Sequence, residues 1–272
     1  SSAASDVYKR QIYQLQPEDL PNATAESFQS PAVGDLSPAF AVGDGCDSVG
    51  GTYPLTVEFN GEQVNPVTTR YCSNVILAGT FNADLYAGRG TMMGEDGMWS
   101  GYMINYNLGN DLHRTPFGGR NFEYISEDPY LTGWISAVQI LGMEKSDVTG
   151  TIKHFCANNQ ESNRHHVDAV VSERALREIY LKGYEIAVKE GGARSIMSTY
   201  GPVNGIWTAG NYDLLTTILR GEWNYDGFVM TDWWAMSNRE GYEATKTTHA
   251  PMVSAGNCLL YTSPSPRDIS GS

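Results

Sequence analysis

Between residues 74 and 231, short apolar runs alternate with longer segments in which apolar residues recur at helical spacing. Five runs have strand length, and we predict strands at residues 74–80, 102–106, 150–155, 195–200 and 227–231. Four segments carry helical spacing or helix-start signals, and we predict helices at residues 82–99, 131–142, 172–191 and 212–223. This alternation predicts a series of β-α-β units built around a parallel sheet.

The remaining parts of the chain show little periodicity. Residues 12–70 are rich in Pro, Gly, Asn, Ser and Asp, which predicts loops with short strands. Residues 1–11 and 258–272 resemble translated adapter sequence, so we expect two foreign tails around one domain at residues 12–257. The natural protein is then expected to begin before residue 12 and to continue past residue 257, which leaves its localisation open.

Composition and charge narrow the classes of partner. Of the 272 residues, 41% are hydrophobic and 11% aromatic, enough for a sizeable core. A formal net charge of -13 argues against nucleic acid and anionic membranes and favours a neutral or cationic ligand. No apolar run is long enough to cross a bilayer. The four cysteines have no C-x-x-C spacing, so we predict neither a disulfide framework nor a metal site, and no cofactor.

An acidic residue directly follows the apolar run 227–231. Asp232 and the indoles of Trp233 and Trp234 would lie at the carboxyl end of a buried strand. In parallel α/β folds, ligands bind beyond these strand ends, so Asp232 would face a substrate. The alternative is an aspartate that caps the next helix, and spacing alone does not decide between the two.

Other polar residues also gather at predicted strand ends. Lys153 and His154 follow Ile152, Tyr200 follows Thr199, and Arg120 lies in a polar loop at residues 109–129. Such a ring suits a neutral polyhydroxylated ligand, because each sugar hydroxyl both donates and accepts hydrogen bonds. Taken singly, each residue has a plainer interpretation. Lys153 and His154 could be a solvated strand end, Arg120 and Arg164 surface ion-pair partners, and Tyr200 a half-buried phenol.

Several motifs in this order resemble glycoside hydrolase family three, whose characterised members are mostly β-glucosidases and related exo-acting β-glycosidases. The resemblance covers about residues 74–257. It rests on Gly119-Arg120-Asn121-Phe122-Glu123-Tyr124, Ser126-Glu127-Asp128-Pro129, Lys153-His154-Phe155, Asn158-Asn159-Gln160-Glu161 with Arg164, and Met230-Thr231-Asp232-Trp233.

The resemblance implies a fold and a set of site residues. The fold would be an α/β (β/α)8 TIM-type barrel, incomplete at both ends. Asp232 would be the catalytic nucleophile. The residues implied to contact the sugar are Arg120, Lys153, His154 and Arg164 on the glycone hydroxyls, Tyr200 beside the nucleophile, Trp233 as a wall of the subsite, and Asp44 on a far hydroxyl. Asp44 is assigned through Asp44-Gly45-Cys46-Asp47, the nearest match to the family's Asp-Gly-Pro-x-Gly, although the same residues could form a simple turn.

The implied reaction is retaining hydrolysis of a small β-glycoside or oligosaccharide by double displacement. We expect nearby cations to hold Asp232 charged. In multidomain members the general acid/base comes from a later domain, so we expect that residue to be missing here and the later domain to pack on the barrel.

Two other functions stay open at this stage. One is a sugar-binding barrel without turnover. The other is a β-N-acetylglucosaminidase or phosphorylase relative that uses a His-Asp acid in the loop after Lys153-His154-Phe155. That loop lacks the glycine and proline of this subset, and we expect the adjacent His165 and His166 to be exposed.

Overall fold

The computed structural model describes residues 29–30, 40–49, 57–65, 67–238 and 243–258. Apart from Cys258, both predicted foreign tails lie outside the described residues, as do residues 12–28, 31–39, 50–56 and 66 of the segment 12–70.

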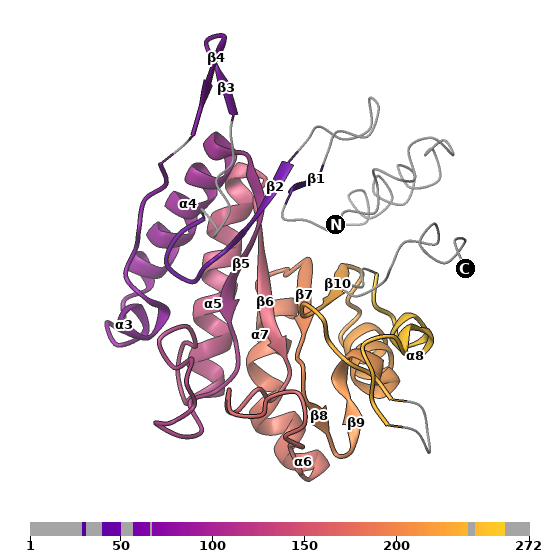
Figure 1. Ribbon diagram of the computed structural model, residues 1–272. Coiled ribbons are helices and arrows are strands. Elements are labelled where there is room, and N and C mark those ends of the chain that lie inside the picture. The colour runs from indigo at the N-terminus through magenta and orange to yellow at the C-terminus, as the bar shows by residue number, and fades with distance from the viewer. Residues whose placement is uncertain (1–28, 31–39, 50–56, 66, 239–242, 259–272) are drawn as a thin grey trace, which may run out of the picture.

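A six-stranded sheet forms the centre of the molecule (Figure 1). Its strands lie in the order β1 (Gln29–Ser30), β2 (Phe40–Asp44), β5 (Tyr102–Gly109), β6 (Thr149–Phe155), β7 (Ser195–Ser198) and β10 (Phe228–Thr231). Every pair from β2 to β10 is parallel, and only β1 runs antiparallel to its neighbour. The predicted parallel α/β fold is therefore confirmed, although the sheet stays open within the described residues.

Helices lie along one face of this sheet, with α5 packed between α4 and α7 (Figure 1). Helix α4 (Ala83–Ser100) begins at Asn82, whose side chain accepts the N–H groups of Asp84 and Leu85, and ends at Gly101 in the left-handed region. Asp128 caps α5 (Pro129–Met143) in the same way. The predicted helix at 172–191 is built as α6 (Glu173–Ala175), the π-helical turn η2 (Leu176–Tyr180) and α7 (Lys182–Lys189).

Shorter elements connect these layers. They are the hairpin strands β3 (Val57–Phe59) and β4 (Glu62–Val64), the pair β8 (Pro202–Val203) and β9 (Ile206–Trp207), the 3-10 turns η1 (Glu144–Ser146) and η3 (Thr208–Gly210), the π-helical η4 (Asp213–Glu222), and α8 (His249–Ser254). No helix in the described ranges is long and apolar enough to cross a membrane.

One predicted strand is wrong. Residues 74–80 contain the helix α3 (Asn74–Ala78), preceded by Ser73 in an extended conformation. Leu77 and Ala78 are buried whereas Ile76 is 63% exposed, which is the pattern of one short helical turn against the core. A short apolar run does not distinguish a buried strand from a buried helix.

The main hydrophobic core lies between the sheet and its helices. Inward-facing residues of neighbouring strands, Ile152, Ile196 and Val229, pack with Leu181 and Leu215 of the covering layer. The parallel register aligns these three strand residues, because Ile196 is paired with Ile152 on one side and Val229 on the other. Packing of this layer fixes the height at which each strand ends, and so positions the residues that follow.

Helices α4 and α5 approach closely through two glycines. A Cβ added at Gly90 would lie 2.7 Å from Cα of Gln139, and one added at Gly142 would lie 2.7 Å from the backbone nitrogen of Thr91. Both contacts are with backbone, which cannot move aside as a flexible side chain can. The helix pair therefore requires glycine at these positions.

We expect Gly90→Ala to lower the free energy of unfolding, because overpacking a tight contact costs about 1–3 kcal/mol. Gly88→Ala is the matched control: it lies in the same helix, and its Cβ would meet nothing within 4 Å. That control should raise stability by about 0.5–1 kcal/mol through helix propensity alone. Urea unfolding of both variants checks the difference, and equal stabilities would contradict the close contact.

Candidate active site

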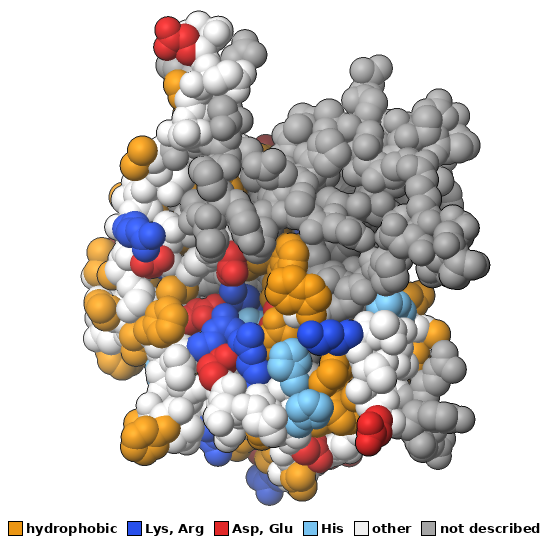
Figure 2. Space-filling model, viewed as in Figure 1, with side chains coloured by type: hydrophobic (Ala, Val, Ile, Leu, Met, Phe, Trp, Pro, Cys, Tyr) orange, Lys and Arg blue, Asp and Glu red, His pale blue; other side chains and the backbone are white. Residues whose placement is uncertain are grey.

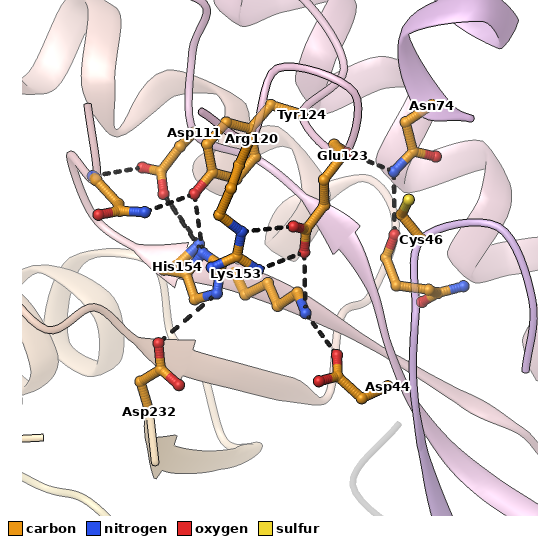
Figure 3. A network of polar contacts seen from close by, with 12 residues as sticks. Asp44, Cys46, Asn74, Asp111, Arg120, Glu123, Tyr124, Lys153, His154 and Asp232 are labelled. Carbon is orange, nitrogen blue, oxygen red and sulfur yellow. Dashed lines mark hydrogen bonds and ion pairs between the residues drawn. The ribbon is translucent and has the colours of Figure 1, made fainter. Parts of the chain in front are cut away.

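The carboxyl ends of four parallel strands bring most of the predicted site residues together. Asp44 is the last residue of β2, Lys153 and His154 lie near the end of β6, and Asp232 directly follows β10. Tyr200 comes two residues after β7. Figure 3 shows Asp232 and Asp44 on either side of His154 and Lys153, with Arg120 and Glu123 reaching in from the loop between β5 and α5.

Glu123 is the centre of the charged contacts in this site. Its Oε2 accepts Nε of Arg120 at 2.6 Å, and its Oε1 accepts a terminal guanidinium nitrogen of Arg120 at 2.8 Å. The same Oε1 lies 3.0 Å from Nζ of Lys153. Lys153 also donates to Oδ1 of Asp44 at 3.0 Å. Two cations predicted to bind sugar are thus held by one buried carboxylate.

Burial and the neighbouring cations shift the pKa of Glu123 in opposite directions. Burial alone would raise the pKa of Glu123, but the charges of Lys153 and Arg120 and their hydrogen bonds outweigh it and lower the pKa to about 2. Burial lowers the pKa of Lys153, yet Glu123 and Asp44 outweigh this effect, so its net pKa is raised. The carboxylate and the ammonium therefore both stay charged at neutral pH.

Asp232 has a different environment. Its Oδ1 accepts the backbone N–H of Trp233 at 2.7 Å, and its Oδ2 lies 3.7 Å from Nε2 of His154. Burial raises the pKa of Asp232 to about 6, and the Trp233 N–H and the charges of Arg120, Lys153 and Arg164 offset only part of the rise. The three cations favour the charged form of Asp232, as expected, but burial has the larger effect on its pKa.

Arg164 and Tyr200 form the neighbouring wall. Arg164 donates to Oε2 of Glu161 at 2.6 Å, and its guanidinium carbon lies 4.4 Å from the centre of the Tyr200 ring. Burial and the charge of Asp232 raise the pKa of Tyr200, and the Tyr200 hydroxyl also hydrogen-bonds Asp232. His165 packs on the same ring, with ring centres 4.2 Å apart.

His154 is enclosed by residues for which the sequence suggested no role. Its Nδ1 lies 3.1 Å from the hydroxyl of Tyr124, which in turn lies 2.7 Å from Nδ2 of Asn158. Asp111 is buried below them and accepts the backbone N–H groups of His154 and Asn158 at 3.1 and 3.2 Å. Burial raises the pKa of Asp111 to about 7 despite these bonds.

A buried amide anchors the loop that carries Arg120 and Glu123. Both protons of the Asn74 amide are used, because Nδ2 donates to the carbonyls of Asn107 and Glu123 at 3.0 and 2.8 Å. The first residue of the unforeseen helix α3 therefore fixes the backbone at the centre of the charged contacts.

The two adjacent histidines behave differently from one another. His166 is exposed, as expected, whereas His165 is half-buried against Tyr200, which corrects that expectation. Neither histidine is paired with a carboxylate in the described part of the chain. Within the same residues, no group of three or more His, Cys, Asp or Glu side chains is arranged to hold a metal ion.

On the surface, these residues form a compact polar area. Figure 2 shows Lys, Arg, Asp and Glu side chains gathered at the middle of one face, with His and hydrophobic side chains beside them. Glu161 and Arg164 are partly exposed there, with 25% and 31% of their side chains accessible, whereas Lys153 and His154 are buried. The side chains of Asp44 and Glu161 are the more accessible carboxylates here, with 43% and 25% exposed, whereas Asp232 is 8% exposed.

Comparison with known proteins finds similar chains among β-glucosidases. A β-glucosidase of Ruminococcus albus is 53% identical over 185 residues, which are 68% of this chain and 20% of that protein. The solved β-glucosidase of Paenibacillus barengoltzii matches with a TM-score of 0.78 and 40% identity over 92% of this chain and 28% of its own. The Kluyveromyces marxianus β-glucosidase, solved in complex with glucose, matches with a TM-score of 0.79 and 32% identity. The match covers 96% of this chain and 29% of that protein.

These likenesses confirm the predicted barrel-type α/β fold. The chain spans about a fifth of the length of the curated relatives it matches. Residues 54–266 match the N-terminal domain of glycosyl hydrolase family 3. Because that match extends over most of the chain and contains every strand-end residue of the site except Asp44, this protein belongs to glycosyl hydrolase family 3.

Proposed function

We propose that this chain forms the nucleophile-bearing barrel of a retaining exo-β-glycosidase that removes terminal non-reducing β-D-glucosyl residues. One observation carries the proposal above others. Asp232, a buried carboxylate, stands at the end of β10 within a group of fixed cationic and aromatic side chains. Retaining glycosidases use such a carboxylate to attack the anomeric carbon.

The contacts of Asp232 hold its carboxyl in place. Oδ1 accepts the Trp233 backbone N–H at 2.7 Å, Oδ2 is 3.7 Å from Nε2 of His154, and the carboxyl also has a hydrogen bond with the Tyr200 side chain. One of these two oxygens would be the attacking atom. Its attack forms a bond to the anomeric carbon and expels the aglycone oxygen, and water then hydrolyses the glycosyl ester and frees the carboxylate.

The glycone site would be built from the donors that surround Asp232. The terminal nitrogen Nη1 of Arg120 is not the one that donates to Glu123, and it lies 4.0 Å from Oε1 of Glu161. The ammonium of Lys153 has three protons, of which Asp44 and Glu123 accept two. The indole of Trp233 follows Asp232 directly and suits the apolar face of a pyranose ring. Such a site selects a neutral polyol and not an anion, since its cations are already balanced.

Glucose is the glycone that the relatives support. The similar proteins from Ruminococcus albus and Paenibacillus barengoltzii are named β-glucosidases, and that of Kluyveromyces marxianus was solved with glucose. The alternative with a His-Asp acid gains no support, because His165 packs on Tyr200 and the Oδ1 of Asp168 accepts the N–H of Gly205.

The second carboxyl that the reaction needs is proposed to come from outside the described residues. Around Asp232, Asp44 and Glu123 contact Lys153, Glu161 contacts Arg164, and Asp111 accepts two backbone N–H groups. None of these groups is free to protonate a leaving group. The relatives' longer chains give room for a further domain that would supply the acid/base and pack on this barrel.

A trapping experiment tests the nucleophile. We expect a 2-deoxy-2-fluoro β-glucoside with a dinitrophenyl leaving group to add one fluoroglucosyl unit to Asp232, because this leaving group departs without acid help and the ester then persists. Mass analysis of peptides locates the label. Asp232→Asn should stay unlabelled, and a label on Glu161 or Asp226 would refute the assignment.

The same labelling should depend on pH. Only the ionised carboxylate attacks, and burial sets the pKa of Asp232 at about 6, so the rate should be near its plateau above pH 7 and fall as pH drops through about 6. Second-order labelling rates between pH 4.5 and 8, taken at reagent concentrations well below saturation, measure the pKa of the free chain, and near-ultraviolet circular dichroism checks that the fold persists. A rate that stays flat down to pH 4.5 would contradict the burial effect.

Glu123→Gln should weaken both stability and sugar binding. The variant keeps the shape but leaves Lys153 and Arg120 without their shared buried countercharge, and breaking such a pair costs about 3–5 kcal/mol. Affinity for a gluconolactone or an iminosugar should fall more than tenfold. Denaturant unfolding and calorimetric titration provide the two readings.

Glu222→Gln is the matched control for this variant. It removes the 2.6 Å contact with Arg177 on the surface, where both side chains are more than a third exposed. Exposed ion pairs contribute little, so stability and sugar affinity should stay as in the unmodified chain. If both variants behave alike, Glu123 is not the centre of the site.

A further inference from the structure

Four side chains form a hydrogen-bonded row behind the candidate nucleophile. The row runs from Glu161 through Asn158 and Tyr124 to His154, whose other ring nitrogen faces Asp232. Figure 3 shows Tyr124 and Asp232 on opposite sides of the His154 ring. The direction of each hydrogen bond in the row follows from counting protons.

Glu161 fixes the orientation of the Asn158 amide. The Glu161 carboxylate accepts Arg164 at 2.6 Å through Oε2, and its Oε1 lies 2.7 Å from the Asn158 amide. A carboxylate paired with arginine can only accept, so the amide atom that faces it is the nitrogen. That nitrogen also lies 2.7 Å from the Tyr124 hydroxyl, and it has nothing but protons to offer. The Tyr124 oxygen is therefore the acceptor in this contact.

Tyr124 then has one proton left to give. Its oxygen is 3.1 Å from Nδ1 of His154, so the hydroxyl donates there and Nδ1 must carry a lone pair. Among the described residues, no other acceptor lies within hydrogen-bond distance of that nitrogen. The nearest carboxylate oxygen, Oδ2 of Asp111, is 3.8 Å away and already accepts the backbone N–H of His154 at 3.1 Å. The remaining ring proton is placed on Nε2.

We propose that Tyr124 and Asn158 are positioning residues that hold His154 in its Nε2–H tautomer, so that the imidazole presents a hydrogen-bond donor beside Oδ2 of Asp232. The proposal builds on the proposed function, in which a sugar hydroxyl next to the reacting carbon accepts this proton. Burial, followed by the charges of Arg120, Lys153 and Arg164, lowers the pKa of His154 well below its usual range, which keeps the ring neutral. A neutral ring has only one proton, and its place decides what His154 can recognise.

Nitrogen-15 NMR of the uniformly labelled chain tests this directly, because the two nitrogens of a neutral imidazole resonate far apart according to which one is protonated. Loss of one pattern in His154→Gln assigns the signals among the five histidines. In the unmodified chain, His154 should show the Nε2–H pattern. A proton on Nδ1 overturns the proposal without any variant.

Tyr124→Phe keeps the aromatic ring, which meets the His154 ring edge-on, but removes the donor. The proton should then divide between the two nitrogens, and affinity for a gluconolactone should fall about three- to tenfold, the loss expected for one neutral hydrogen bond. Asn158→Ala should shift the proton in the same direction, since Tyr124 is then free to accept. An unchanged Nε2–H pattern in both variants refutes the positioning role.

Tyr225→Phe is the matched control. It removes an equally buried tyrosine hydroxyl, one that donates to the Phe228 carbonyl at 2.6 Å and does not touch His154. The Tyr225→Phe chain should be less stable than the unmodified chain, while the nitrogen-15 pattern of the His154 ring stays unchanged. If the tautomer shifts as predicted but no variant or parent chain binds a glycoside or lactone, the proposed function fails and the tautomer assignment stands. The two are thus tested separately.

Discussion

The carboxylate of Glu123 lies between two cations, the buried Lys153 and the partly buried Arg120. Taking an ammonium or a guanidinium out of water costs several kcal/mol, and only a well-placed countercharge offsets that cost. Glu123 provides it for Lys153 of β6 and for Arg120 of the preceding loop at once. Asn74 in turn holds the Glu123 backbone from α3. Glu123 thus joins β6, the loop and the short helix, while Asp44 at the end of β2 is a second partner of Lys153.

The carboxyl groups of this site show how far their surroundings can move the pKa of the same kind of group. Glu123, with two cations in contact, has a pKa of about 2, whereas Asp232, which has no cation in direct contact, has a pKa of about 6. Asp111, satisfied mainly by backbone N–H groups, reaches about 7. Asp232, the proposed nucleophile, therefore has the intermediate pKa of the three. A raised pKa strengthens a carboxylate as a nucleophile while leaving most of it ionised at neutral pH.

Sequence patterns predicted the features that depend on local order. The apolar run before Asp232 and the one before Lys153 form buried parallel strands, because continuous apolar runs suit strands covered on both faces. Their polar ends accordingly meet at one edge of the sheet. The pattern was misleading at Asn74, where a run of a few apolar residues fits one helical turn equally well. The partnerships of Glu123, Tyr124 and Asp111 were not predictable in this way, since each joins segments about 30 to 45 positions apart. The only local signal was that Glu123 stands three residues after Arg120 in a motif already recognised.

The contacts of Glu123 also affect how much side-chain entropy a ligand would remove on binding. Lysine and arginine have the most rotatable side chains, and immobilising such a side chain at an interface costs about 0.5–1.5 kcal/mol. Here Lys153 and Arg120 are held by contacts with Glu123, which belong to the folded chain itself. Their conformational entropy is lost when the protein folds and not when a sugar arrives. A weak neutral ligand can therefore gain nearly the full value of each hydrogen bond it forms with them.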